Sequence, residues 1–417
     1  MDTINDYLAE GNCADIFYFD FSKAFDSVPH YRMLTKLANY GLPKSILNII
    51  HDFLTDRSMR IRVGNTLSDV RNVLSGVPQG SVLGPLLFLL FVNDIPDGIK
   101  NMLQIFADDV KLVADPLEYE FVVADLEALT CWEQLWGLRF NLDKCKVMYL
   151  GKDNPHNKYI FAGSEMPVVE EETDLGVTFN SSFDFGNHIS ASIAKAKRIM
   201  AWLSRIIISR EPDLMIRLYK AMIRPHLEYC TQVWAPLATY GNWSVIGEIE
   251  AVQKAFTRMI NGIGLWTYKE RLHELKLTTL LERRMRGDLI ETFKVVNGHV
   301  NYGSNLFGHS RTGRHLVARA CTSKLTNNKR DFFAQRVLKY WNKLPENIRN
   351  SPTVNSFKNR LDGFREEGIK KDLCGHYWEL SNEFFNRTEV NAKSRLNYTN
   401  YMKSHPYYAK YRKVNIK

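Results

Sequence analysis

The chain has 417 residues, of which 45% are hydrophobic, 12% aromatic and 24% charged. This is the composition of a soluble globular protein with large buried cores, and the length suggests two or three domains of roughly 150 residues each. The longest apolar run, residues 82–92, is too short for a membrane-spanning helix, which needs about 20 residues. We therefore expect no association with a membrane.

Charge is unevenly distributed along the chain. Residues 1–180 contain 15 Lys and Arg against 26 Asp and Glu, whereas residues 181–417 contain 40 against 20. The acidic half is suited to cations and the basic half to a polyanion such as nucleic acid, although basic surfaces can also serve only for solubility. The six cysteines have neither zinc-ligand spacing nor a disulfide framework, and the polar N-terminus is not a signal peptide. We expect an intracellular, reduced protein.

The first 165 residues alternate between strand and helix patterns. In chain order they predict a strand at 15–20, helices beginning at Pro29 and Pro43, a hairpin of 59–63 with 70–74, a deeply buried helix at 81–94, strands at 102–106 and 110–113, a helix at 117–136 and a strand at 146–150. Such alternation favours an α/β fold.

Long helical patterns follow. They cover residues 189–208, 214–229, 248–260, 280–296 and 329–365, with a loop-like basic stretch at 301–325 between the last two. They predict a separate helical domain. From residue 391 to the end the sequence has seven Lys and Arg, five Tyr and no acid, which predicts a weakly ordered tail.

Three carboxylates occupy positions where metal-dependent phosphoryl transfer would place them. Asp20 ends an apolar strand, and Asp108-Asp109 forms the tip of the predicted hairpin of 102–106 with 110–113. Two divalent ions need carboxylate oxygens from at least two rigid elements, and strands that are neighbours in one sheet would bring these residues together. Taken alone, an Asp-Asp tip is more often a solvated turn than a metal site.

A glycine-rich segment lies between these two elements. In Ser75-Gly76-Val77-Pro78-Gln79-Gly80-Ser81, glycines flank a rigid proline and the segment then opens a helix. Such a loop allows the backbone and the Gln79 amide to approach a base or a sugar closely. An ordinary helix-entry turn is the alternative.

Together, these segments resemble the motifs of reverse transcriptases. Residues 20–26 (DFSKAFD) resemble motif A, residues 75–85 (SGVPQGSVLGP) motif B as found in LINE-type elements, and residues 106–109 (FADD) motif C. Their order and spacing also fit. Residues 141–144 (NLDK) resemble motif D. Segments between residues 175 and 358, among them YWNKLP at 340–345, resemble the region that follows the polymerase in jockey-like non-LTR retrotransposons.

The resemblance implies roles for individual residues. Asp20, Asp108 and Asp109 would hold two Mg²⁺ ions, with Mn²⁺ as a possible substitute. Lys144 would be the general acid for the leaving pyrophosphate, although a surface lysine is the alternative and Lys146 competes for the role. The backbone amides of residues 21–24, beginning with Phe21, would face the triphosphate. Phe25 would lie under the sugar and exclude a 2′-hydroxyl. Gln79 and Gly80 would contact the incoming nucleotide or the template.

The resemblance also implies the domain organisation and the partners. Residues 1–165 would form an α/β polymerase palm, an antiparallel sheet backed by helices. Residues 166–300 would form the primer grip and an all-helical thumb, 301–365 a basic helical extension and 366–417 a tail. The partners would be an RNA template, a DNA primer and deoxynucleoside triphosphates; the oligomeric state is left open.

Two other interpretations remain possible at this stage. Only 19 residues precede Asp20, so the segment that builds the fingers in related enzymes is absent, and we expect an N-terminally truncated chain of doubtful activity. The chain could therefore be a catalytically dead remnant of a decayed transposon that still binds RNA or DNA. An RNA-dependent RNA polymerase shares the palm, but Phe25 argues against it because a ribonucleotide needs space for its 2′-hydroxyl.

Overall fold

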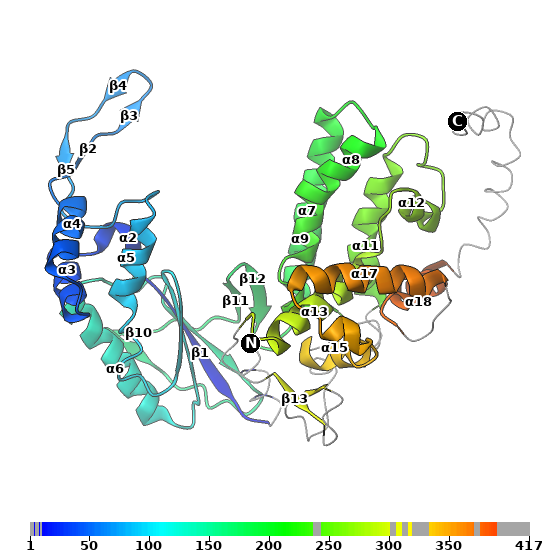
Figure 1. The fold of residues 1–417 in the computed structure, drawn as a ribbon. Coiled ribbons are helices and arrows are strands. Elements are labelled where there is room, and N and C mark those ends of the chain that lie inside the picture. The colour runs from blue at the N-terminus through cyan, green and yellow to red at the C-terminus, as the bar shows by residue number, and fades with distance from the viewer. Residues whose placement is uncertain are drawn as a thin grey trace, which may run out of the picture. The chain divides into compact units, whose positions relative to one another are not determined.

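The computed structural model describes residues 4, 8, 11–236, 243–300, 306–310, 316–318, 333–370 and 376–389. The chain divides into two compact units, which are drawn in Figure 1. Residues 10–173 and 180–183 form the first, here called the sheet unit; residues 1–9, 174–179 and 184–417 form the second, the helical unit. The division falls just beyond the boundary expected at residue 165, and no further division occurs near residue 301.

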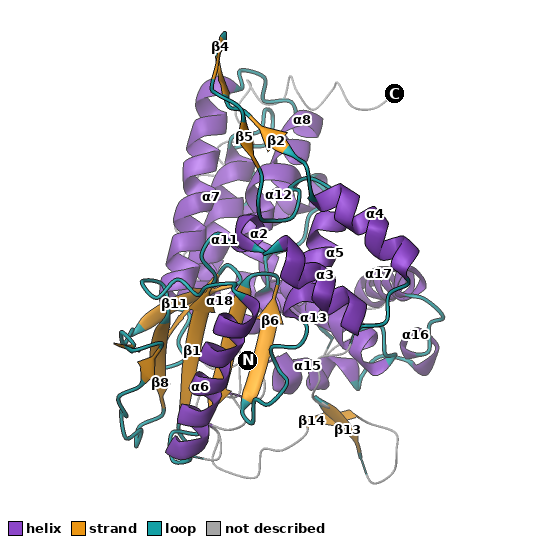
Figure 2. Ribbon diagram, turned by 90° about the vertical axis from the view of Figure 1, so that its left-hand side faces the viewer, coloured by secondary structure: helices purple, strands orange, loops and turns teal. Residues whose placement is uncertain are grey.

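The sheet unit is built on four antiparallel strands. They are β1 (Ala14–Asp20), β6 (Met102–Phe106), β7 (Asp109–Ala114) and β8 (Lys146–Leu150), in the order β6-β7-β1-β8. Each neighbouring pair is antiparallel, so the predicted antiparallel palm sheet is confirmed. Figure 2 shows the sheet with α6 lying along it. The central position of β1 explains its sequence, since a strand paired on both edges is rich in aromatic and β-branched residues.

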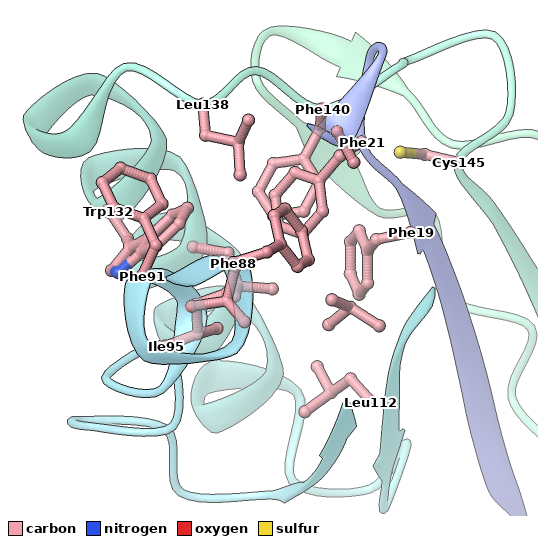
Figure 3. Close-up of a cluster of buried hydrophobic side chains, with 14 of the residues drawn as sticks. Phe19, Phe21, Phe88, Phe91, Ile95, Leu112, Trp132, Leu138, Phe140 and Cys145 are labelled. Carbon is pink, nitrogen blue, oxygen red and sulfur yellow. The ribbon is translucent and has the colours of Figure 1, made fainter. Parts of the chain in front are cut away.

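One face of this sheet shares a single apolar core with a group of helices. They are α2 (Ala24–Ser27), α3 (His30–Asn39), α4 (Lys44–Leu54), α5 (Leu83–Val92) and α6 (Tyr119–Trp136). Pro29 and Pro43 stand at the N-caps of α3 and α4, as the sequence predicts. Phe17 and Phe19 point from β1 into the same core as Phe88 of α5, and Figure 3 shows part of this cluster. Burial of each such ring contributes about 1.5–3 kcal/mol.

Helix α5 is shorter and less buried than its sequence suggests. It spans Leu83–Val92, and only one side of it enters the core, through Leu87, Phe88 and Phe91. Leu86 and Leu89 are about half exposed, at 51% and 49%. The predicted deep burial therefore holds for one side of the helix only, because a continuous apolar sequence gives no indication of which side enters the core.

Small hairpins complete the sheet unit. One of them is a long hairpin arm: β2 (Ser58–Met59) and β5 (Arg71–Asn72) pair at the base of the arm, and β3 (Arg62–Val63) pairs with β4 (Thr66–Leu67) at its tip. Figure 1 shows this arm extending beyond α4. Two further pairs follow in the chain, β9 (Ile160–Phe161) with β10 (Ser164–Glu165) and β11 (Glu171–Asp174) with β12 (Val177–Asn180). The division between the two units runs through the β11–β12 hairpin.

The described part of the helical unit is almost entirely helical. Its elements are α7 (Gly186–Ile206), α8 (Pro212–Leu218), η1 (Tyr219–Ile223), α9 (Arg224–Glu228), α10 (Thr231–Trp234), α11 (Trp243–Arg258), α12 (Tyr268–Glu274), α13 (Leu280–Val296), α15 (Phe333–Trp341), α16 (Glu346–Arg349), α17 (Val354–Lys370), α18 (Glu379–Glu389) and one hairpin, β13 (Phe307–His309) with β14 (Leu316–Ala318). The expectation of an α/β unit followed by a helical one is thus confirmed. None of the described helices combines the length and the apolar character needed to cross a bilayer.

The helix expected at residues 214–229 is interrupted by a π-helical turn. Segment η1 joins α8 to α9, and the Arg224 amide donates to the Tyr219 carbonyl five residues earlier. The cause is Pro225, which lacks an N–H and whose ring crowds the carbonyl of the preceding turn. Widening this turn keeps the chain helical across the proline.

The C-terminal helices pack into the core of the helical unit. Phe357 of α17 stacks on Phe293 of α13 with ring centroids 4.4 Å apart. Trp378 and Phe385, beyond the boundary expected at 366, are buried in the same cluster. Helical structure therefore continues past residue 366, because these aromatic side chains complete the apolar surface of α13. Residues 390–417 of the expected tail, and most of the loop at 301–325, lie outside the described residues.

Candidate active site

Strand pairing brings two of the predicted carboxylates face to face. Asp20, the last residue of β1, is the register partner of Asp109, the first residue of β7. Directly opposed residues in an antiparallel pair have Cα atoms about 4.5–5.5 Å apart and project their side chains from the same face. Phe19 and Val110, one step along each strand, point into the helix-covered core. Asp20 and Asp109 therefore project from the opposite face of the sheet.

The third carboxylate belongs to the turn that joins β6 to β7. Phe106 is paired with Asp109, so the turn consists of Ala107 and Asp108 alone. Ala107 has a φ of 53°, a left-handed conformation that a side chain makes costly by about 1–2 kcal/mol. A positive φ at the first central residue is typical of the tight turns that match strand twist. The structure therefore places Asp108 next to Asp109 by means of a strained turn, a feature common at functional sites.

Asp20 also has a cationic neighbour. The ammonium of Lys144 lies 3.0 Å from Oδ2 of Asp20 and offsets the repulsion expected between two opposed carboxylates. Backbone bonds position it, because the Asn141 amide donates to the Asp20 carbonyl and the Lys144 amide donates to the Asn141 carbonyl, at 2.7 and 2.9 Å. The competing Lys146 instead pairs with Glu172 at 2.5 Å.

The donor atoms at this site suit a hard divalent cation. Carboxylate oxygens on rigid strands are what Mg²⁺ and Mn²⁺ prefer, and the paired positions of Asp20 and Asp109 fit that requirement. Among the residues that the structure describes, no three His, Cys, Asp or Glu side chains are gathered closely enough to form a ready-made metal site. The structure thus brings two of the three predicted ligands together and places the third, Asp108, in the adjoining turn.

The glycine-rich loop is anchored to the segment that follows β1. The Gly76 amide donates to the Val28 carbonyl at 2.8 Å, and the Val77 amide donates to the Phe25 carbonyl at 2.7 Å. Gly76 has a φ of 87°, and a Cβ there would lie 2.6 Å from the Cα of Asp26. Only glycine fits such a position, so the loop and the segment after Asp20 form one interlocked structure.

Three side chains that the sequence analysis did not identify form hydrogen bonds with this loop. His30 Nε2 lies 2.9 Å from the Gly76 carbonyl, and Arg57 Nη2 donates to the same oxygen at 3.0 Å. Asp26 accepts a hydrogen bond from Nε2 of Gln79 at 2.8 Å. The position of Asp26 inside the DFSKAFD motif was a signal for such a role. No sequence signal indicated His30 or Arg57, which lie 46 and 19 residues from Gly76 in the sequence.

Gln79 and Gly80 lie at the exposed end of the loop. The Gln79 side chain is oriented by Asp26, and Gly80 has a φ of 79° with nothing within 4 Å of the position that a Cβ would take. The loop thus presents an oriented amide beside an open stretch of backbone. This placement is compatible with the predicted contact to a nucleotide or template, which stays a prediction.

The two predicted aromatic residues differ in placement. Phe25 is half-buried, and its ring stacks on Phe88 with centroids 4.7 Å apart, so it forms a fixed surface. Phe21 is buried and stacks on Phe140 at 4.5 Å, within the cluster of Figure 3. The Phe21 side chain is therefore part of the core. Of the nearby amides expected to face phosphate, that of Ser22 already donates to the Arg139 carbonyl at 2.8 Å.

Comparison with known proteins shows which family the sequence resembles. Residues 5–181 match the family described as reverse transcriptase (RNA-dependent DNA polymerase). The probable RNA-directed DNA polymerase from transposon X-element of Drosophila melanogaster is 29% identical over 298 residues, covering 66% of this chain and 31% of that protein. The RNA-directed DNA polymerase from mobile element jockey of the same species is 26% identical over 262 residues, covering 59% and 28%. This chain thus spans about a third of the length of these relatives.

A solved structure also shows a partial likeness. The apo telomerase of Candida tropicalis superimposes with a TM-score of 0.38 at 12% identity, covering 69% of this chain and 46% of that one.

Proposed function

Since this chain belongs to the reverse transcriptases of jockey-like non-LTR retrotransposons, we propose that it is built to extend a primer 3′-hydroxyl with deoxynucleotides copied from RNA. The observation that carries the proposal is the register of β1 with β7, which opposes Asp20 and Asp109 on the face of the sheet away from the core shared with the helices. Asp108 adjoins them in a two-residue turn. Paired carboxylates on rigid strands are the minimum that this chemistry demands of the protein.

In this proposal Asp20, Asp108 and Asp109 hold two Mg²⁺ ions, for which Mn²⁺ can substitute. The ions would supply activation of the attacking hydroxyl and charge stabilisation for the leaving pyrophosphate. The carboxylates would bind and orient, and the strands would keep them from moving apart. Asp108 would complete the set by a side-chain rotation at the turn.

The surrounding residues have separate tasks in the same proposal. Lys144 would donate a proton to the leaving pyrophosphate, and its position 3.0 Å from Asp20 places an ammonium group beside the reacting phosphates. Phe25, fixed by stacking on Phe88, would exclude a 2′-hydroxyl from the sugar position. Gln79 and Gly80 would contact the incoming nucleotide or the template.

The proposed partners are an RNA template, a DNA primer and deoxynucleoside triphosphates. The net charge of residues 181–417, 40 basic against 20 acidic, supports phosphate binding by the helical unit without base specificity. The proposed setting is an intracellular ribonucleoprotein, nuclear or cytoplasmic.

A second candidate is binding of RNA or DNA without catalysis. The observation that favours it is the lack of three gathered carboxylates among the described residues. In that case the charge of the helical unit would still hold nucleic acid, and the face of the sheet that carries Asp20 would have no chemical role.

The deciding experiment is primer extension on poly(rA)–oligo(dT) with Mg²⁺ or Mn²⁺. We expect Asp108→Asn and Asp109→Asn each to lower incorporation about 100-fold or more, since each removes charge from the site of transfer. Asp69→Asn, which changes an exposed carboxylate in the hairpin arm, should leave it unchanged. Equal incorporation by all four proteins would refute the proposal, and RNA binding without extension would favour the second candidate.

A further inference from the structure

The helical unit contains a cavity lined mainly by cationic side chains. Its volume is about 250 Å³, and six of its lining residues are basic. We call this cavity the basic cavity. Its six basic residues come from η1, α9, the loop after α12, α13 and α17, and they are Lys220, Arg224, Lys276, Arg283, Arg286 and Arg365. The four arginines are partly buried, so they lose part of their hydration there, whereas Lys220 and Lys276 are exposed at the cavity.

Carboxylates hold two of the guanidinium groups in fixed orientations. Arg286 donates from Nε and Nη2 to the two oxygens of Asp362, both at 2.6 Å. Arg283 binds Glu228 in the same way, with Nη2 donating to Oε2 at 3.1 Å. These pairs use one edge of each guanidinium. Among the described residues, Nη1 of Arg283 and of Arg286 has no acceptor, which leaves two oriented donors for a ligand at the cavity.

The charges of the basic cavity do not balance. Three carboxylates neutralise part of it, Glu228, Glu282 and Asp362, so six cations leave an excess of three positive charges. Lys220 and Lys276 form no ion pair within the part of the chain that the structure describes. Burial, and then the charge of Arg283, lowers the pKa of Arg224, whereas the hydrogen bond to Asp362 raises the pKa of Arg286.

From this geometry we infer that the basic cavity is a binding site for phosphate oxyanions, occupied by the backbone of a nucleic acid strand. Phosphate accepts several hydrogen bonds at once and takes up the excess positive charge, and guanidinium groups match its geometry. The charge of the whole basic half of the chain favours a polyanion over a free phosphate. The inference rests on the proposed binding of nucleic acid by the helical unit, which it assigns to named residues, and it does not depend on polymerase activity.

The test uses the full chain and a fluorescent single-stranded RNA, without nucleotide or divalent cation. Lys220→Ala with Lys276→Ala removes two lysines that have no ion pair, so the fold should persist, as an unchanged thermal unfolding midpoint would confirm. We expect RNA affinity to fall about tenfold and the slope of log K against log salt to decrease in magnitude by about 1.4, since each lost phosphate contact with a single strand changes it by about 0.7. The matched control is Lys197→Ala with Lys269→Ala, two exposed lysines outside the cavity, which should have less effect.

The outcomes separate the possible sources of phosphate. If millimolar tripolyphosphate competes with RNA in the parent chain but not in the Lys220→Ala, Lys276→Ala variant, the site takes phosphate groups. If tripolyphosphate binds to the parent chain, and the cavity double variant and the control double variant bind RNA equally well, the site takes a free oligophosphate rather than a strand. Equal behaviour of both double variants towards both ligands would overturn the inference. A chain that binds RNA here but fails primer extension would refute only the proposed activity.

Discussion

Replacement of Gly76 by alanine should destabilise the sheet unit more than any other small change in the glycine-rich loop. The new Cβ would lie 2.6 Å from the Cα of Asp26 and 2.7 Å from the carbonyl oxygens of Phe25 and Asp26. All three are backbone atoms, so no side chain can rotate away. The φ of 87° adds strain of about 1–2 kcal/mol, and the overlap adds about 1–3 kcal/mol. We expect a total loss of roughly 2–5 kcal/mol, a large part of the 5–15 kcal/mol typical of a domain.

Gly80→Ala is the matched control for this change. Gly80 has a similar φ of 79°, but nothing lies within 4 Å of its Cβ position, so only the strain of about 1–2 kcal/mol should remain. Hydrogen exchange of the β1 amides, followed by mass spectrometry, measures the opening free energy of this unit alone. Equal destabilisation by the two substitutions would refute the interlocking of the loop with the segment after Asp20.

Two further predictions concern buried charges, one in each unit. Lys36 is buried, lies 3.8 Å from the centroid of the Trp136 ring and pairs with Asp94 at 2.6 Å. We expect Lys36→Met to lower the free energy of unfolding by about 3 kcal/mol in urea titrations, and Asp94→Asn in the same chain to restore part of it. Burial raises the pKa of Glu250 from its ordinary value of 4.5 to about 7. The folded state then holds the extra proton, so stability should fall by about 3 kcal/mol as pH rises from 4.5 to 7; Glu250→Gln should remove this dependence, and an unchanged slope would contradict the assignment.

The sequence predicted the elements that local patterns determine. The helix Lys44–Leu54 begins directly after Pro43 and the strand Lys146–Leu150 has the bounds expected, because a proline start and an apolar alternation mark them without help from distant residues. The opposition of Asp20 and Asp109 followed from the assumption that β1 and β7 are neighbours, which is confirmed.

Long-range contacts could not be predicted. His30 and Arg57 meet at the Gly76 carbonyl from positions 46 and 19 residues away. The exposed side of α5 depends on which helices pack beside it, and the continuation of helix beyond residue 366 depends on aromatic residues that find their partners on α13. Nothing in the local sequence pattern encodes such pairings.

Binding of Mn²⁺ to the full chain, followed by electron paramagnetic resonance, tests most directly whether the opposed carboxylates form a metal site. Asp20→Asn and Asp109→Asn should each weaken Mn²⁺ binding about tenfold or more, because each removes a charged ligand from the pair. Asp69→Asn should bind as the parent chain does. Unchanged Mn²⁺ affinity in Asp20→Asn and Asp109→Asn would contradict the proposed chemistry, whatever the family of the chain.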